Sequence, residues 1–115
     1  MNDKPIDELV AEKVMGWIKP PETSILKAMW VETPVGAVHP QLPKFSTNIK
    51  DAWLVIDALY EKENIRMFVS NNFHPLWEAR CKKDNGDWIG HGVDNYSAPM
   101  AICIAALKAV GEDWQ

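Results

Sequence analysis

The chain has 115 residues, of which 47% are hydrophobic and 24% charged, and this is typical of a single globular domain over residues 1–115. Its formal net charge of −4 disfavours non-specific binding to nucleic acid or to anionic membranes, because both need a basic surface. No apolar run approaches the roughly 20 residues that a membrane-spanning helix requires. Cys81 and Cys103 lack metal-ligand or CxxC spacing, so we expect two buried thiols of a reducing cytoplasm.

The first part of the chain is predicted to contain a helix, a strand and a loop. Residues 6–16 have the spacing of an amphipathic helix, which Gly16 ends. Residues 25–32 are expected to form a strand, although their apolar and polar residues alternate imperfectly. Residues 33–45 contain three prolines and a glycine, and they therefore predict an ordered loop.

A second helix is expected from a cap at Ser46 or Thr47 to about Glu63. Its large apolar residues fall on one face, with Ala52 and Leu59 beside them, and we expect this face to be buried: Ile49, Trp53, Ile56 and Tyr60. Six tryptophans are many for a chain of this length. Most of them, with Trp17 and Trp53 as the clearest cases, are expected in the core.

Three strands and a third helix are predicted for the remainder. The strands are expected at Ile65–Ser70, Leu76–Lys83 and Asp87–Gly92. The helix is expected at residues 97–110, with Ser97 as N-cap and Gly111 just beyond the last turn. The order α-β-α-β-β-β-α predicts an α+β fold, a three-layer type of sandwich with a small antiparallel sheet of three or four strands and three helices.

The turns between the strands predict which side chains share a face of the sheet. Asn85-Gly86 is typical of a two-residue hairpin loop, which would pair Arg80 with His91 and Lys82 with Ile89. We therefore expect the side chains of Arg80 and His91 on one face.

A symmetric loop over residues 71–75 would place Arg66 opposite Arg80, with Phe68 one step along on the same face. These are the only two arginines of the chain. Like charges directly opposite destabilise a strand pair unless an anion lies between them. Glu78 would be such an anion, and the face would then be an ordinary solvated polar surface with a salt bridge. A bound phosphate would serve as well, because Arg binds phosphate through two parallel hydrogen bonds.

The sequence contains none of the common catalytic or metal-binding motifs, such as HxH, HExxH, a P-loop or a nucleophile elbow. A set of Ser70, His91 and Asp94 can be chosen as a triad, but any chain of this size permits such a choice. Gly90-His91-Gly92 suits close approach to a ligand and suits a β-bulge equally well. We expect no catalytic residue, no metal and no cofactor.

The start of the last helix is a second candidate for binding an anion. Its free backbone N–H groups favour a phosphate, and Ser97 caps the helix whether or not a ligand binds. Tyr96 is placed to stack on a base or ribose. Trp30 and Phe45 either line a pocket or merely pack, and Trp88 is expected to pack.

Three blocks carry a family resemblance. Ala11–Trp17 (AEKVMGW), the Phe45-Ser46-Thr47 cap followed by Ala52-Trp53, and Ala98–Gly111 together resemble the phage ABA sandwich family, in the family's order. Residues 18–44 match no pattern of that family. The resemblance implies a three-layer α/β/α domain of small tailed-phage proteins. It also implies a phage origin and action in the cytoplasm of the infected bacterial host, and it brings no catalytic motif.

Small non-enzymatic phage proteins of this kind resemble counter-defence factors that sequester nucleotide second messengers of host immunity. The leading hypothesis is therefore binding, without cleavage, of a cyclic or linear ADP-ribose derivative or a cyclic dinucleotide by a homo-oligomer. The residues expected to meet phosphates are Arg66, Arg80, His91 and Ser97, and those expected to stack on bases are Trp30, Phe45, Phe68 and Tyr96. The alternatives are a factor that inhibits a host enzyme through an exposed aromatic patch and, third, a small nucleotide hydrolase.

Overall fold

The computed structural model describes residues 5–18, 30–32, 37–39, 42–73, 76–94 and 97–112. Helix α1 (Ile6–Leu9) continues directly into a π-helical turn, η1 (Val10–Val14). The other elements are β1 (Trp30–Glu32), β2 (Ala37–His39), α2 (Ile49–Glu63), β3 (Ile65–Phe73), β4 (Leu76–Lys83), β5 (Trp88–Asp94) and α3 (Ala98–Ala109). The α+β class is confirmed, with helices before and after a three-stranded antiparallel sheet of order β3-β4-β5.

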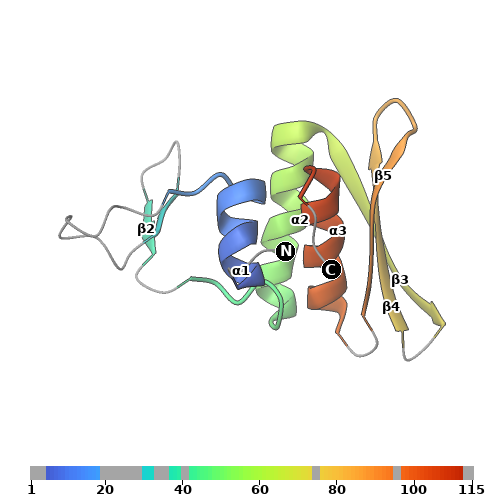
Figure 1. Cartoon of the computed structure of the whole chain (residues 1–115), viewed down its shortest axis with the longest axis horizontal. Coiled ribbons are helices and arrows are strands. Elements are labelled where there is room, and N and C mark those ends of the chain that lie inside the picture. Colours follow the sequence, from blue (N-terminus) through green and yellow to red (C-terminus); the bar gives the residue numbers. More distant parts are fainter. Residues whose placement is uncertain are drawn as a thin grey trace.

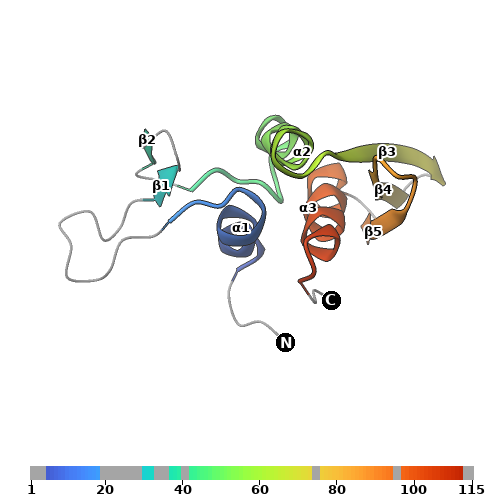
Figure 2. The same cartoon turned by 90° about the horizontal axis from the view of Figure 1, so that it is seen from above.

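The helices stack on one side of this sheet. Helix α3 packs on β4 and β5, α2 packs on β3 and α3, and η1 packs on α2 and α3. Figures 1 and 2 show the sheet at one end of the molecule, with α1 on the far side of α2 and α3 and the β1–β2 hairpin at the opposite end. The second face of the sheet is not covered by any helix in the described part of the chain.

The core lies between η1, α2 and α3 and the inner face of the sheet. Its fully buried side chains include Leu9, Val10, Val55, Leu59, Ile102 and Leu107. Trp17 is only 5% exposed, so its predicted core position is confirmed. Cys81 and Cys103 are buried and free, also as predicted, and burial raises the pKa of the Cys81 thiol to about 12.

Helix α2 turns a different face to the core from the one its large apolar residues predict. Small and medium residues such as Ala52, Val55 and Leu59 are fully buried, whereas Trp53 is 49% exposed and Tyr60 50% exposed. The prediction that Trp53 lies in the core is therefore wrong. Small side chains let α2 approach its neighbours closely, and this close approach leaves the bulky residues on its flank.

The cap of α2 also differs from the prediction. Asn48 is the N-cap, and its Oδ1 accepts hydrogen bonds from the backbone N–H of Lys50 at 2.9 Å and of Asp51 at 3.3 Å. The backbone N–H of Ser46 instead donates to Asp7 Oδ1 at 2.9 Å. Ser46 therefore fastens the turn before α2 to α1 rather than beginning the helix.

Part of the predicted proline-rich loop is a strand. β2 pairs antiparallel with β1, with Trp30 opposite His39, so the prediction of a loop throughout residues 33–45 is wrong at residues 37–39. Of the predicted strand at 25–32, Trp30–Glu32 is confirmed as β1, and residues 25–29 lie outside the described residues.

The hairpin between β4 and β5 has a three-residue loop, not the two-residue loop that Asn85-Gly86 predicts. The backbone N–H of Lys83 donates to the Asp87 carbonyl at 2.9 Å, and Gly86 takes a positive φ of 97°. A type I turn followed by a left-handed residue gives this geometry. Because the loop is one residue longer, the register shifts by one, and Lys82 pairs with Trp88 instead of Ile89.

A bulge then restores the predicted pairing farther along β5. The register shifts between Cys81 and Lys82, leaving Ile89 as the additional residue of β5, and Arg80 pairs with His91 as predicted. Between β3 and β4 the register is two residues from the prediction, so that Phe68 faces Arg80. Arg66 therefore faces Lys82 and not Arg80, which corrects the predicted arginine pair.

Two glycines of β5 allow the sheet to touch α3. Gly90 and Gly92 pair with Cys81 and Ala79, which are buried on the inner face. A Cβ atom would lie 2.4 Å from the Ala105 carbonyl oxygen at Gly90, and 2.4 Å from the Ala101 carbonyl oxygen at Gly92. The glycines thus permit close approach to a helix backbone, rather than to a ligand as one sequence interpretation had it.

We expect Gly92→Ala to lower the free energy of unfolding by about 1–3 kcal/mol, because the added methyl group meets backbone atoms that cannot turn aside. Urea denaturation followed by tryptophan fluorescence measures this change. Val93→Ala is the matched control, since Val93 is the next residue, is 43% exposed and lies on the other face. A midpoint for Gly92→Ala equal to that of the control would contradict the close approach.

Candidate functional site

The outer side of the three-stranded sheet, called the open face below, gathers cations and aromatic rings. Along each strand the side chains of the open face alternate with side chains on the helix-covered face. The open face carries Arg66, Phe68 and Ser70 on β3, Glu78, Arg80 and Lys82 on β4, and Trp88, His91 and Val93 on β5. Phe68 is 51% exposed and Trp88 54% exposed. Large aromatic rings with this exposure are uncommon on a protein surface that contacts only water.

Four of the predicted site residues lie together on this face: Arg66, Phe68, Arg80 and His91. The register error described above is two residues, and an even shift leaves every side chain on its predicted face. The two arginines therefore share the uncovered side of the sheet, although they are not directly opposite.

The other predicted site residues do not join this group. Trp30 is 4% exposed and lies in the β1–β2 hairpin, at the other end of the molecule (Figures 1 and 2). Phe45 is fully buried, with its ring 5.8 Å from that of Trp17. Tyr96 lies outside the described residues.

Ser97 is the N-cap of α3, as predicted, and its Oγ accepts a hydrogen bond from the Met100 N–H at 3.1 Å. The same hydroxyl donates to the Ser46 carbonyl oxygen at 3.4 Å. Ser97 lines a separate groove of about 440 Å³ beside Trp53 and Trp77, on the helical side of the sheet. It is therefore not part of the open face.

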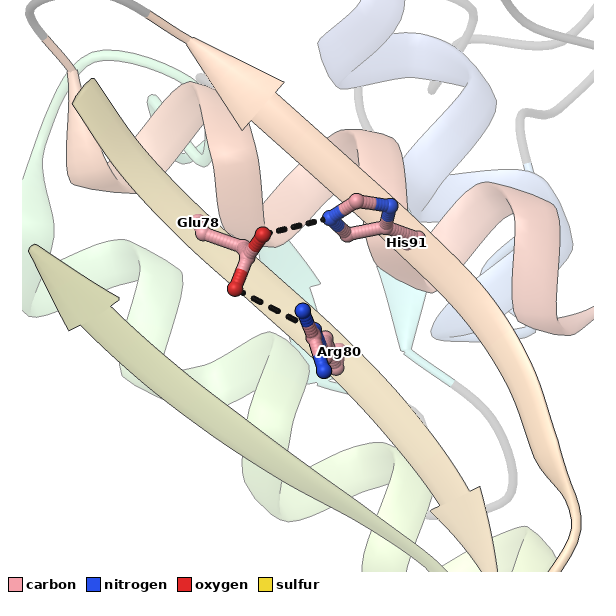
Figure 3. A network of polar contacts seen from close by, with 3 residues as sticks. All are labelled: Glu78, Arg80 and His91. Atoms are coloured by element: carbon pink, nitrogen blue, oxygen red, sulfur yellow. Dashed lines mark hydrogen bonds and ion pairs between the residues drawn. The ribbon is translucent and has the colours of Figure 1, made fainter. Parts of the chain in front are cut away.

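Glu78 joins Arg80 and His91, as Figure 3 shows. Its Oε1 lies 3.1 Å from Nε of Arg80, and its Oε2 lies 2.8 Å from Nε2 of His91. An ionised carboxylate only accepts hydrogen bonds, so Nε2 of His91 carries the proton in this contact. The carboxylate holds both side chains in place across β4 and β5.

The neighbours of Glu78 favour its ionised form. The hydrogen bond from His91 is the largest influence on the pKa of Glu78 and lowers it, partial desolvation raises it by less, and the charge of Arg80 lowers it further. The net result is a pKa below the ordinary value of 4.5. Glu78 is therefore an anion at neutral pH and neutralises part of the charge of the open face.

Trp88 lies at the centre of the aromatic and cationic groups. Its ring centroid is 5.6 Å from that of Phe68, 5.9 Å from Cζ of Arg80 and 5.2 Å from Nζ of Lys82. These are distances at which cations are attracted to an indole ring. The sequence led us to expect that Trp88 packs, but the three-residue hairpin loop pairs it with Lys82 and places it on the open face.

Arg66 stands at the edge of this group. Its Nε lies 3.8 Å from Oδ1 of Asp84, and its guanidinium carbon lies 5.5 Å from the ring centroid of Tyr60 on α2. Lys82, which faces Arg66 across the strands, contacts Trp88 instead. The two opposing cations are thus stabilised by different partners.

A pocket of about 450 Å³ opens beside Arg80 at the β5 edge of the sheet. Its lining includes Arg80, Trp88 and His91 from the open face, and Lys108 from the last turn of α3. Lys108 was missed because sequence alone does not show which turn of α3 reaches the β5 edge. Lys82 has a signal in the sequence, since it follows Arg80 by two residues on the same face of a strand.

Within the described ranges, no group of three or more His, Cys, Asp or Glu side chains is arranged to hold a metal ion. None of the described helices is long and apolar enough to span a membrane. The hydrogen bonds of the described residues join His91 to Glu78 and not to Ser70.

Comparison with protein families gives one result. The profile of the phage ABA sandwich domain matches residues 8–107, which is most of the chain. The chain belongs to this family and is a phage protein. The comparisons with curated proteins and with solved structures gave no significant match.

The contacts of Glu78 predict its titration. In an NMR titration the Glu78 carboxylate is expected to change charge below pH 4.5, and His91→Ala should raise its pKa, because the largest lowering influence is removed. Because the pKa of Glu78 is lower in the folded than in the unfolded chain, its ionisation stabilises the fold at pH values above the pKa of the unfolded chain. This contribution is lost as the pH falls through the pKa of the folded protein. Lys83→Ala, whose register position is on the other face of the same strand, should leave the titration unchanged. An unchanged Glu78 pKa in His91→Ala would contradict the geometry of Figure 3.

Proposed function

We propose that this phage protein binds a small anionic nucleotide on its open face and sequesters it without cleaving it. The observation that carries the proposal is the meeting of cations and aromatic rings on one exposed surface, where Phe68, Arg80 and Lys82 each lie close to the ring of Trp88. Nucleotides combine an anionic phosphate with a flat base, and proteins bind them with these two kinds of group.

Arg80 is the group best placed for a phosphate. Its contact with Glu78 uses Nε, and a guanidinium has four further N–H donors on its two Nη atoms. Glu78 thereby orients Arg80 while leaving its outer edge for bidentate binding of a phosphate. Lys108 lines the same pocket and supplies a further donor.

Phe68 and Trp88 are the groups best placed for a base. Both rings are about half exposed and tilted by 58° to each other, so their free faces offer stacking surfaces next to Arg80. Stacking of one base on an aromatic side chain contributes about 1–3 kcal/mol. Together with a phosphate contact this suits a mononucleotide-sized or dinucleotide-sized ligand.

The overall charge of −4 opposes anion binding, but only weakly at this site. Charges separated by more than about 8 Å are largely screened at physiological ionic strength. Nearer to a bound phosphate, Arg66, Arg80 and Lys82 outnumber Glu78 and Asp84.

The contacts of Glu78 and His91 support sequestration rather than cleavage, because these two groups hydrogen-bond to each other. Glu78 is held ionised by its two neighbours, and His91 donates its Nε2 proton to it. No described hydrogen bond activates Ser70 as a nucleophile. The protein needs no cofactor for such a role.

Membership in a phage family supports a target in the infected host. Nucleotide second messengers of host immunity combine a phosphate with a base and therefore suit this surface. We therefore propose a counter-defence role in the host cytoplasm, with cyclic or linear ADP-ribose derivatives and cyclic dinucleotides as the ligands to test. The half-exposed Phe68 and Trp88 favour one alternative, namely inhibition of a host enzyme through this aromatic patch.

A panel of these nucleotides tests the proposal by differential scanning fluorimetry. At least one should raise the Tm, because a ligand that binds only the folded state stabilises it, and mass spectrometry after heating should recover it unaltered. Arg80→Ala should abolish the shift while changing the free energy of unfolding by less than about 1 kcal/mol, as expected for an exposed ion pair.

Lys83→Ala is the matched control, because Lys83 is an exposed cation on the same strand with its register position on the opposite face. It should keep the full Tm shift. No shift with any nucleotide would reject the proposal, and a cleaved ligand would favour the hydrolase. A host protein that co-purifies without any nucleotide effect, and is lost in Trp88→Ala, would favour the enzyme inhibitor.

A further inference from the structure

Helix α2 exposes a narrow apolar stripe formed by Ile49, Trp53, Ile56 and Tyr60. Three of these side chains are between 42% and 50% exposed, and Ile56 is half-buried. Their spacing of four, three and four residues keeps them on one line along the helix. This spacing is that of the seam between two packed helices, yet no described helix of the chain lies on it.

The stripe lies on the flank of α2 that faces the β3 edge of the sheet. Tyr60 contacts Arg66 of β3, and Ile49 and Trp53 line the groove of about 440 Å³ together with Val69 and Trp77. β3 is an edge strand. The stripe therefore borders a recess at the margin of the molecule, where another element has room to pack.

We propose that a second copy of this chain fills this position, with the two α2 helices packed antiparallel about a two-fold axis. The stripe is symmetric about a point between residues 54 and 55, so Trp53 of each copy meets Ile56 of the other, and Ile49 meets Tyr60. A two-fold axis requires such a self-complementary surface.

The charges beside the stripe agree with the same arrangement. Lys50 and Asp57 are exposed on the solvent side of the stripe, seven residues apart, and neither forms an ion pair with another described residue. In the antiparallel pair Lys50 of each copy lies beside Asp57 of the other, which gives two equivalent ion pairs.

The size of the contact predicts a weak dimer. Burial of these side chains and their neighbours removes roughly 400–600 Å² per copy, less than the about 800 Å² of a standard interface. We therefore expect a monomer–dimer equilibrium in the micromolar range. The stripe meets the open face only at Arg66, which Tyr60 contacts, whereas Arg80 and Trp88 lie on the other side of the sheet from the groove. The dimer therefore leaves Arg80 and Trp88 free, and the inference does not depend on the proposed function.

Sedimentation velocity over micromolar concentrations tests the dimer. Trp53→Glu should raise the dimer Kd at least about tenfold, because a charge replaces a large apolar side chain at the seam. Leu54→Glu is the matched control, since Leu54 is 43% exposed on the same helix but points away from the stripe. It should leave the Kd unchanged. A wild-type chain that stays monomeric, or equal effects of the two variants, would overturn the proposal.

Charge reversal gives a test that needs no change in the apolar stripe. Lys50→Glu and Asp57→Lys should each weaken the dimer, because each places like charges side by side in the pair. The double variant restores opposite charges and should recover the wild-type Kd. A double variant weaker than either single variant would overturn the antiparallel arrangement. Far-ultraviolet circular dichroism confirms that each variant is folded.

Discussion

The contact between the backbone of β5 and the backbone of α3 determines what the rest of the molecule exposes. Gly90 and Gly92 have no side chains, so α3 lies directly on β5 with its small residues Ala101 and Ala105 against the strand. This contact leaves no room for a larger side chain at the positions of Gly90 and Gly92 on the inner face. Beside this contact the bulky and charged side chains of Arg80, Trp88 and His91 occupy the outer face, which no described helix covers.

The open face differs from an ordinary solvated surface in how its charges are held. Glu78 contacts both Arg80 and His91 and leaves the Nη donors of Arg80 uncovered, and Trp88 contacts two cations at once. Such preorganisation lowers the entropy that is lost when a ligand orders the side chains around it. The proposed sequestration of a ligand would need this kind of surface and no catalytic group.

The sequence predicts the elements well where local signals are strong. Ser97 and Gly111 bound α3 as predicted, and β4 has the predicted ends. The errors have non-local causes. One additional loop residue at the Asn85-Gly86 turn moves Trp88 from the inner to the outer face. The buried face of α2 depends on how closely α3 approaches it, and apolar spacing along α2 does not contain that information. Likewise, Lys108 joins the site only through packing of α3 on β5.

The location of the ligand is the central claim, and NMR mapping tests it most directly. A nucleotide that stabilises the protein would be titrated into ¹⁵N-labelled chain, with backbone amides and tryptophan indole N–H groups followed. We expect the largest shift changes at the Trp88 indole and at the amides around Arg80 and His91, with α2 and the β1–β2 hairpin unaffected. Changes centred on Ser97 and the start of α3, with the Trp88 indole unmoved, would contradict the account.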